Sequence, residues 1–498
     1  MRTRDVHEDT PLLGQTCGDD AQERSKPINT PLPWRQLSIL LLLLLAEPLT
    51  SQVIAPFLPQ LIREIGITHG DDSRIGYYVG LVYSLFFISQ ACTVFLWSRA
   101  SDQIGRRPII LIGLAGLSVP TYYVGLSRTF WGLVFSRCLS GALNGNVGVI
   151  KSMVTEITDS TNVVRAFSFV PMTWFLGVTI GPLIGGSLER PTERFPTVFG
   201  RSSFLKEYPY FLPCSISATF TAICWFIVFL SLNETIQAKI SPTEYFLGRW
   251  RKSHAPSGGS LAVVEDYALD CSKKPLSFRE LLIAPVLVAA GSYASFAILD
   301  ISFRTVLPVY LATPLELGGL GLDPPVIGTI LAIIGISGGV FQLLFFPPLH
   351  NRLGGKNLFL MAISLFLPIA ALFPITNRVG QKQGLNNLVW FLVGLMIFLF
   401  VLANLALGVT FVYVNGAAPN RASIGATNGL AQLLVSIVRA VGPWAVNSAF
   451  ALGIQQHVMG GHFAYWVIVG MTAISLVIGA ALPERPSNVH ESARTSQS

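Results

Sequence analysis

Charged residues are scarce in this chain: Asp, Glu, Lys and Arg together make up 12% of its 498 residues, about half the share typical of a soluble domain. By contrast, 51% of the residues are hydrophobic, and apolar runs recur along the whole length. Uncharged runs of ~20 residues are too long and too many for the buried helices of a soluble protein. The sequence therefore excludes an ordinary cytosolic enzyme and predicts an all-α integral membrane protein.

Cysteine and histidine are also sparse. The 6 Cys and 7 His are scattered, with no CxxC pair and no two His four residues apart. The sequence thus predicts neither a disulfide framework nor a metal site, and no cofactor. It also lacks a His/Asp acyltransferase pair and a nucleotide-binding loop, so we expect no enzyme. The net charge of +7 matches the Lys and Arg that insertion places in cytoplasmic loops, so we expect no nucleic-acid partner.

Apolar runs bounded by charges, Pro or Gly predict twelve transmembrane spans. Those of the first half are residues 36–58, 77–96, 109–126, 130–153, 167–187 and 211–232. Those of the second half are residues 281–303, 326–346, 358–373, 388–412, 424–450 and 463–482. The prediction is therefore two six-helix halves, 36–232 and 281–482, joined by a polar linker, 233–280, and flanked by tails 1–35 and 483–498.

The Lys and Arg of the connections predict the orientation. If the N-terminus is cytoplasmic, that side holds 22 of the 34 basic residues and the other side holds 9. We counted Lys151 among the cytoplasmic ones, whereas Arg137, Arg304 and Arg439 fall inside spans. The excess predicts that both termini are cytoplasmic.

A short motif between spans 2 and 3 has a degenerate copy half a chain later. The first reads Ser98-Arg-Ala-Ser-Asp102-Gln-Ile-Gly105-Arg106-Arg107, and the second contains His350-Asn-Arg-Leu-Gly354-Gly-Lys356. Duplication of a six-span unit explains the copy, and such repeats are typical of transporters. Gly permits a tight turn, and Asp102 with the arginines is suited to charge-assisted bonds with helix ends across the interface of the halves.

This loop resembles the signature GxxxD(R/K)xGRR of the major facilitator superfamily, except for Ser98 and Gln103. The resemblance implies a latch that gates transport, formed by Asp102, Gly105, Arg106 and Arg107. Span 5 contains Gly177-Val-Thr-Ile-Gly181-Pro182-Leu-Ile-Gly185-Gly186, which is similar to the GxxxGPxxGG element of the antiporter branches. Small residues four apart allow close helix packing, and Pro182 permits a bend.

Two further segments suggest a subgroup. Ala46-Glu47-Pro48 in span 1 and Ser436-Ile-Val-Arg439-Ala-Val-Gly442-Pro443 in span 11 are similar to the drug:proton antiporters with twelve spans, and among them to the fungal and plant zinc-induced-facilitator-like proteins. Arg137-Cys-Leu-Ser-Gly141 in span 4 resembles the RxxxG element of the superfamily. The resemblance implies a cavity lined by spans 1, 4, 7 and 10.

Charged residues inside spans are the strongest functional candidates, because each costs about 3 kcal/mol at the bilayer centre. They are Glu47, Arg137, Asp300, Arg304 and Arg439. Asp300 and Arg304 are four residues apart and so share a helical face. Glu47 lies near the middle of span 1, where a low dielectric favours its protonated form and a guanidinium favours its ionised form. Glu47 is therefore either a proton carrier or a structural partner of Arg137 or Arg439.

Polar and aromatic residues at similar depth are candidates for the substrate cavity. They are Gln52, Asn144, Asn146, Trp174, Tyr293, Asn404 and Gln432. Such a lining favours an amphipathic organic molecule. We therefore predict a monomeric, proton-coupled antiporter that exports a small molecule by alternating access. An organic-anion carrier, such as one for dicarboxylates, is the alternative if the arginines line the cavity, and an integral-membrane enzyme is a third class.

The predicted location is the plasma membrane. Glu8-Asp-Thr-Pro-Leu12-Leu13 fits the acidic dileucine sorting pattern, which leaves a vacuolar membrane as the alternative.

Overall fold

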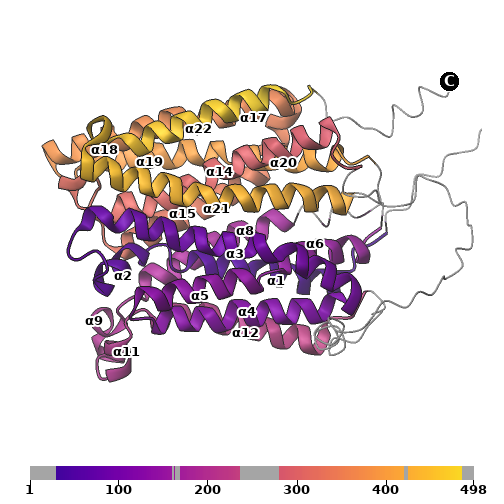
Figure 1. Cartoon of the computed structure of the whole chain (residues 1–498), viewed down its shortest axis with the longest axis horizontal. Coiled ribbons are helices and arrows are strands. Elements are labelled where there is room, and N and C mark those ends of the chain that lie inside the picture. The colour runs from indigo at the N-terminus through magenta and orange to yellow at the C-terminus, as the bar shows by residue number, and fades with distance from the viewer. Residues whose placement is uncertain are drawn as a thin grey trace, which may run out of the picture.

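The computed structural model describes residues 30–159, 162, 166, 169–235, 280–419 and 424–484. Within these ranges the regular secondary structure is helical. The helices form two groups that lie side by side with their long axes nearly parallel, α1 to α12 in one and α14 to α22 in the other (Figure 1). We call these the N-terminal and C-terminal halves. The dileucine pattern and most of the predicted linker lie outside the described residues.

The N-terminal half follows the predicted spans closely. Its long helices are α1 (Trp34–Gln52), α3 (Ile75–Ile104), α4 (Arg106–Leu126), α5 (Phe130–Leu143), α6 (Asn146–Ile157), α8 (Val170–Ser187) and α12 (Phe211–Ser231). Short helices join them: α2 (Leu58–Ile65), η1 (Asp72–Arg74), α9 (Pro191–Arg194), α10 (Pro196–Phe199) and α11 (Ser203–Glu207).

The C-terminal half also follows the predicted spans. Its helices are α14 (Ala284–Ala312), η3 (Leu315–Leu317), α15 (Pro324–Leu344), α16 (Phe346–Leu353), α17 (Gly355–Ser364), α18 (Phe366–Gln383), α19 (Asn387–Ala403), α20 (Leu405–Gly416), α21 (Ile424–Gln456), η5 (Val458–Gly461) and α22 (Phe463–Ala480). The predicted end of span 7 at residue 303 was wrong, because α14 continues to Ala312. Arg304 therefore lies well inside a helix and not at its end.

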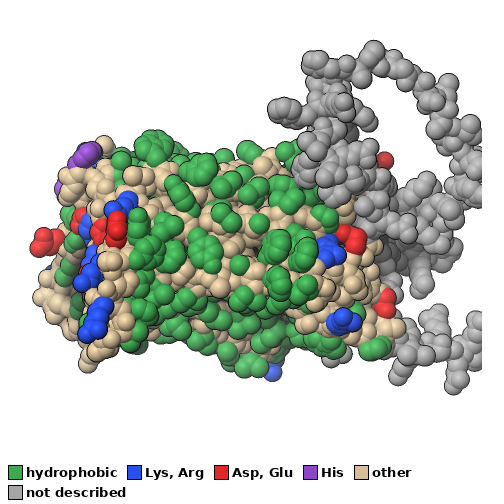
Figure 2. All heavy atoms as spheres, turned by 90° about the horizontal axis from the view of Figure 1, so that it is seen from below, with side chains coloured by type: hydrophobic (Ala, Val, Ile, Leu, Met, Phe, Trp, Pro, Cys, Tyr) green, Lys and Arg blue, Asp and Glu red, His purple; other side chains and the backbone are tan. Residues whose placement is uncertain are grey.

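The outer surface suits a bilayer. Among the described residues, 10 helical segments are long and apolar enough to cross a membrane. Hydrophobic side chains cover the middle of the face seen in Figure 2, whereas the charged side chains gather at its two ends. The predicted spans absent from those segments are span 1, whose helix α1 carries Glu47, and span 4, which is interrupted.

The interruption of span 4 lies at Asn144 and Gly145, between α5 and α6. A Cβ atom on Gly145 would lie 2.4 Å from Cβ of Trp97, so only glycine allows α3 to approach this closely. The indole of Trp97 donates a hydrogen bond to the carbonyl of Ala142 over 2.7 Å, which uses a carbonyl freed at the end of α5. The break therefore presents the Asn144 side chain in the interior of the bundle, at a point where the backbone is not helical.

The repeat proposed from the sequence has a matching backbone. Gly105 precedes α4 with φ 100° and ψ 161°, and Gly354 precedes α17 with φ 77° and ψ 159°. Both values of φ are in the region that favours glycine. The two motif copies thus make the same turn between consecutive helices.

The halves are in close contact at the end of the bundle opposite residues 233–235, which we call the far end. There Gly186 of α8 lies against Gly328 of α15, and a Cβ atom on either glycine would come within 3.0 Å of the other's Cα. Nearby, a Cβ on Gly80 of α3 would lie 2.8 Å from the carbonyl oxygen of Pro443 in α21. The backbone N–H of Trp444 donates to Ser84 Oγ over 3.1 Å. These contacts hold the halves together at the far end.

Candidate functional site

The carboxyl group of Glu47 lies where both halves meet. It faces the side chains of Asn144 and Gln90 in the N-terminal half, and it lies in the electrostatic field of Lys151 and Arg439. Arg439 belongs to α21 in the C-terminal half. Glu47 therefore interacts with Arg439 and not with Arg137, the other partner considered from the sequence. We call the group formed by Glu47, Gln90, Asn144, Lys151, Trp174 and Arg439 the central cluster.

Lys151 is the residue that sequence reasoning missed. Its placement among the cytoplasmic basic residues was wrong: it lies in the middle of α6 and is half-buried. Its ammonium lies 5.7 Å from the ring centroid of Phe411, in α20 of the other half. The signal that would have found it is the predicted extent of span 4, 130–153, which contains position 151.

Arg439 makes the corresponding contact in the opposite direction. Its guanidinium carbon lies 5.6 Å from the ring centroid of Trp174, which belongs to α8 of the N-terminal half. Gln432 lies two turns before Arg439 on the same face of α21 and is half-buried. Among the described residues, Arg439 Nε and Glu47 Oε2 are buried and have no hydrogen-bond partner. The side-chain amide of Asn144 is in the same state.

A second polar group lies on α14. Arg304 Nε donates to Asp300 Oδ1 over 2.8 Å, as their spacing indicates, and Arg304 Nη2 donates to Asn404 Oδ1 over 3.0 Å. The guanidinium also lies 5.2 Å from the ring centroid of Phe400. The charge of Arg304 is thus compensated within the C-terminal half.

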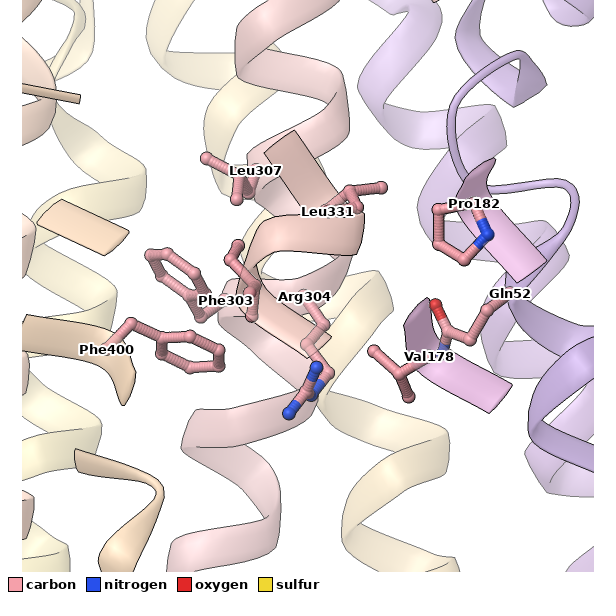
Figure 3. A pocket seen from close by; sticks show the side chains of 9 residues that line it. Gln52, Val178, Pro182, Phe303, Arg304, Leu307, Leu331 and Phe400 are labelled. Atoms are coloured by element: carbon pink, nitrogen blue, oxygen red, sulfur yellow. The ribbon is translucent and has the colours of Figure 1, made fainter. Parts of the chain in front are cut away.

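A small pocket separates this group from the N-terminal half. Gln52, Val178 and Pro182 line one side, and Arg304 with Phe303 and Phe400 lines the other (Figure 3). Its volume of about 10 Å³ accommodates about one water molecule. The pocket is therefore the closed part of the interface, on the far side of the central cluster.

The remaining candidates divide into two sets. Tyr293 is buried and its ring lies 5.6 Å from that of Phe411, so it adjoins the central cluster. Arg137 is buried beside Tyr83 and Cys214 and lies 5.9 Å from the ring centroid of Phe86. Asn146 packs against Gly113 of α4. The last two thus lie inside the N-terminal half and away from the interface.

The predicted gate loop is held by ion pairs within the N-terminal half. Arg106 pairs with Asp102 over 2.7 Å and with Glu156 of α6 over 2.9 Å. The carboxylate of Glu234 accepts the backbone N–H groups of Arg106 and Arg107 over 2.8 and 3.0 Å, which caps the N-terminus of α4. We expected bonds from this loop across the interface of the halves. The Arg106–Glu156 ion pair instead joins the loop to α6 of its own half. A latch across the halves stays a prediction.

The glycines of span 5 share one face of α8, and that face contacts α1. A Cβ on Gly177 would lie 2.6 Å from Pro48 Cγ, one on Gly181 would lie 3.1 Å from the carbonyl oxygen of Leu49, and one on Gly185 would lie 1.9 Å from that of Val53. Gly186 faces α15 instead. The motif thus packs α8 against the helix that carries Glu47, and at Gly186 against the other half.

The comparisons with known proteins agree with this architecture. The family model described as Major Facilitator Superfamily matches residues 40–443. The chain belongs to the major facilitator superfamily. It is therefore a multi-pass membrane protein with the fold of a transporter, and not an enzyme.

Relatives of this superfamily member include an export protein. The efflux pump azaK of Aspergillus niger is 28% identical, with 94% of this chain and 92% of that protein covered. The zinc-induced facilitator 1 protein of Arabidopsis thaliana is 27% identical, with 94% and 95% covered. Among solved structures, a D-xylose–proton symporter aligns with a TM-score of 0.64 at 14% identity, covering 91% of this chain and 98% of that one. The predicted kinship with the zinc-induced-facilitator-like proteins is confirmed.

Proposed function

We propose that this transporter exports an amphipathic small organic molecule in exchange for protons, with Glu47 as the proton carrier. The position of the Glu47 carboxyl carries the proposal: it lies in the electrostatic field of Lys151 of one half and of Arg439 of the other. Its ionised form attracts Arg439 across the interface, and a proton on Glu47 removes that attraction. Protonation thereby changes how strongly the halves hold together, as proton coupling requires. The kinship with an efflux pump supports export.

The oligomeric state, orientation and location that we propose rest on the sequence. The protein works as a monomer of two six-helix halves, with both termini in the cytoplasm, because most basic connections lie on that side. Its location is the plasma membrane, with the vacuolar membrane as the alternative that the dileucine pattern offers.

The organic-anion alternative has less support. It requires several arginines at the substrate, whereas Arg137 is enclosed in the N-terminal half and Arg304 is paired with Asp300. Of the three arginines, Arg439 is the one in the central cluster.

The test begins with cells that do or do not produce the protein. Compounds whose appearance in the medium depends on the protein are identified by mass spectrometry and then followed in proteoliposomes with a pH gradient. We expect wild type to accumulate them against their gradient inside acidic vesicles. Glu47→Gln keeps the shape but cannot titrate, so it should exchange these compounds without a gradient and fail to accumulate them. Glu193→Gln, at an exposed position of α9, is the matched control.

Two results would contradict the proposal. One is a Glu47→Gln variant whose transport depends on pH as the wild type's does. The other is wild-type accumulation that does not respond to the pH gradient.

A further inference from the structure

A groove on the outer surface of the C-terminal half lies between α15 and α19. Its volume is about 420 Å³, which is within the range of about 300 to 1,000 Å³ that small-molecule sites have. Both helices belong to the segments that are long and apolar enough to cross a membrane. Ile333 of α15 and Phe398 of α19 line the groove and are exposed. Its walls therefore belong to the surface that faces lipid, and we call it the lipid-facing groove.

Gly394 of α19 widens this groove. A Cβ atom at Gly394 would meet nothing within 4 Å, so the glycine does not serve close packing of two helices. In the middle of a helix, glycine is otherwise unfavourable. Gly335 of α15 is different, because its Cβ would lie 2.8 Å from the backbone nitrogen of Thr179 in α8. Gly335 thus brings two helices together, whereas Gly394 leaves space between α15 and α19.

The groove begins at the far end of the bundle. Asn377 and Gln381, near the end of α18, each donate a hydrogen bond over 3.0 Å to the carbonyl oxygen of Leu315. These bonds place the starts of α15 and α19 at the same end. From Val326 to Phe341 along α15, the groove extends over about 22 Å at 1.5 Å per residue. It thus passes through the hydrocarbon of the far leaflet, which is about 15 Å thick.

The polar groups at the start of the groove suit a hydroxyl group. Thr329 and Trp390 line the groove there, and Ser337, the third polar residue of the lining, lies deeper. The Thr329 hydroxyl donates to the carbonyl of Pro325 over 2.8 Å, so its oxygen is left to accept, whereas the indole N–H of Trp390 is a donor. A hydroxyl group both donates and accepts. The residues that line the groove are all uncharged, so a phosphate headgroup would find no cation among them.

The apolar remainder of the groove favours a rigid body. Branched and aromatic side chains line it, among them those of Ile333, Phe341, Phe398 and Val401. A flexible acyl chain loses conformational freedom when it is held along one path, whereas a system of fused rings has little freedom to lose. Sterols are the membrane lipids that combine fused rings with a single hydroxyl head.

We propose that the lipid-facing groove binds one sterol molecule of the far leaflet, with its hydroxyl at Thr329 and Trp390 and its fused rings beside Gly394. None of the residues that line the groove belongs to the central cluster. The proposal therefore depends neither on proton exchange nor on the exported compound.

A photoreactive cholesterol with a diazirine in its ring system tests the proposal. The purified full-length protein is reconstituted in phosphatidylcholine vesicles that contain a small fraction of this probe, irradiated and digested for mass spectrometry. We expect labelling of α15 and α19 that excess cholesterol or ergosterol displaces and that dioleoylglycerol, a flexible lipid with a hydroxyl head, does not. No displaceable labelling of these helices, or equal displacement by dioleoylglycerol, would overturn the proposal.

Gly394→Leu fills the groove, and its side chain enters open space. We expect this variant to lose most of the displaceable labelling and to keep the wild-type melting temperature. Gly470→Leu, at a glycine of α22 with equally open surroundings, is the matched control and should be labelled as wild type is. Equal labelling of Gly394→Leu and wild type would contradict the site. A dimer that wild type forms and Gly394→Leu does not would show that a second copy fills the groove, and would also contradict it.

Thr329→Val and Trp390→Phe test the polar end of the groove. Each keeps most of the side-chain volume and removes one hydrogen bond to the sterol hydroxyl, a loss that typically weakens binding about two- to tenfold. The probe concentration that gives half-maximal labelling should rise by that factor in each variant. Wild-type values in both variants would refute the proposed placement of the hydroxyl.

Discussion

Arg439 and Trp174 belong to different halves of the protein, and the guanidinium carbon of Arg439 lies 5.6 Å from the ring centroid of Trp174. In the alternating-access cycle that we propose, one half moves against the other, so we expect this contact to be made and broken in each cycle. We therefore expect it to act on the balance between the inward-open and outward-open states more than on folding.

The first prediction concerns this ring. Trp174→Ala removes a cation–π contact worth about 0.5 to 2 kcal/mol, so we expect slower transport with normal membrane insertion. Trp174→Phe keeps an aromatic face and should retain most of the rate. The control is Trp131→Ala, since Trp131 has 75% of its surface exposed on the outside of the bundle. Export rates in cells, normalised to the amount of protein, give the measurement; equal losses in Trp174→Ala and Trp131→Ala would count against the prediction.

The second prediction separates two carboxylates of the gate loop. Asp102 is 59% exposed and forms a surface pair with Arg106, so Asp102→Asn should change stability by at most about 1 kcal/mol. Because the family latch depends on this position, we expect slower transport with expression retained. Glu234 caps α4 through two backbone N–H groups, and Glu234→Ala should cost about 0.5 to 2 kcal/mol.

Thermal unfolding and turnover of the purified variants decide between the two roles. Wild-type turnover in Asp102→Asn would refute its part in gating. An unchanged melting temperature in Glu234→Ala would refute the capping role.

The third prediction concerns Gly181. A Cβ at this position would lie 3.1 Å from the carbonyl oxygen of Leu49 and 3.2 Å from Gln52 Cβ, so leucine must push α8 away from α1. Overpacking of this kind costs about 1 to 3 kcal/mol. Since α1 carries Glu47, we expect Gly181→Leu to reach the membrane, to export poorly and to leak protons.

Gly470→Leu is the matched control, because a Cβ on this glycine of α22 meets nothing within 4 Å. Proton leak is measured in reconstituted vesicles with a pH-sensitive dye. Intact export without added leak in Gly181→Leu would show that this face has no functional part.

Features that are set within one helix were predictable from the sequence, whereas contacts between helices were not. The helices were predictable because ~20 apolar residues in a row have few other stable arrangements in a bilayer. The Asp300–Arg304 pair was predictable because both partners lie on one helix, where spacing fixes the face. Contacts between helices are not encoded in spacing, so the contact of Lys151 with Phe411 and that of Arg439 with Trp174 required the structure.

Lys151 shows why one misassignment occurred. A lysine near the end of an apolar run ordinarily marks a cytoplasmic loop. Here the break at Asn144 and Gly145 starts a new helix, α6, and Lys151 is its sixth residue. Because of this break in the backbone, Lys151 lies within a helix beside the candidate site and not in the predicted loop.

The fourth prediction concerns acid stability at the far end. Arg378 Nη2 donates to His462 Nε2 over 3.0 Å, which requires a neutral imidazole. Burial, and then the positive charge of Arg378, lower the pKa of His462 below its usual value of 6.5. The unfolded chain therefore takes up a proton at a higher pH than the folded protein, so the contribution of this pair to stability is fully present above about pH 6.5 and is lost as the pH falls through the lowered pKa.

His462→Gln tests that sign, because a glutamine oxygen accepts the same bond from Arg378 and does not titrate. The purified protein is melted at pH 7.5 and at pH 5, and the difference between the two melting temperatures is compared with that of wild type. We expect a smaller difference in His462→Gln, whereas His457→Gln, at a neighbouring exposed histidine, should keep the wild-type value. If instead His462→Gln loses as much stability on acidification as wild type does, the acid sensitivity has another source and the Arg378–His462 bond does not set it.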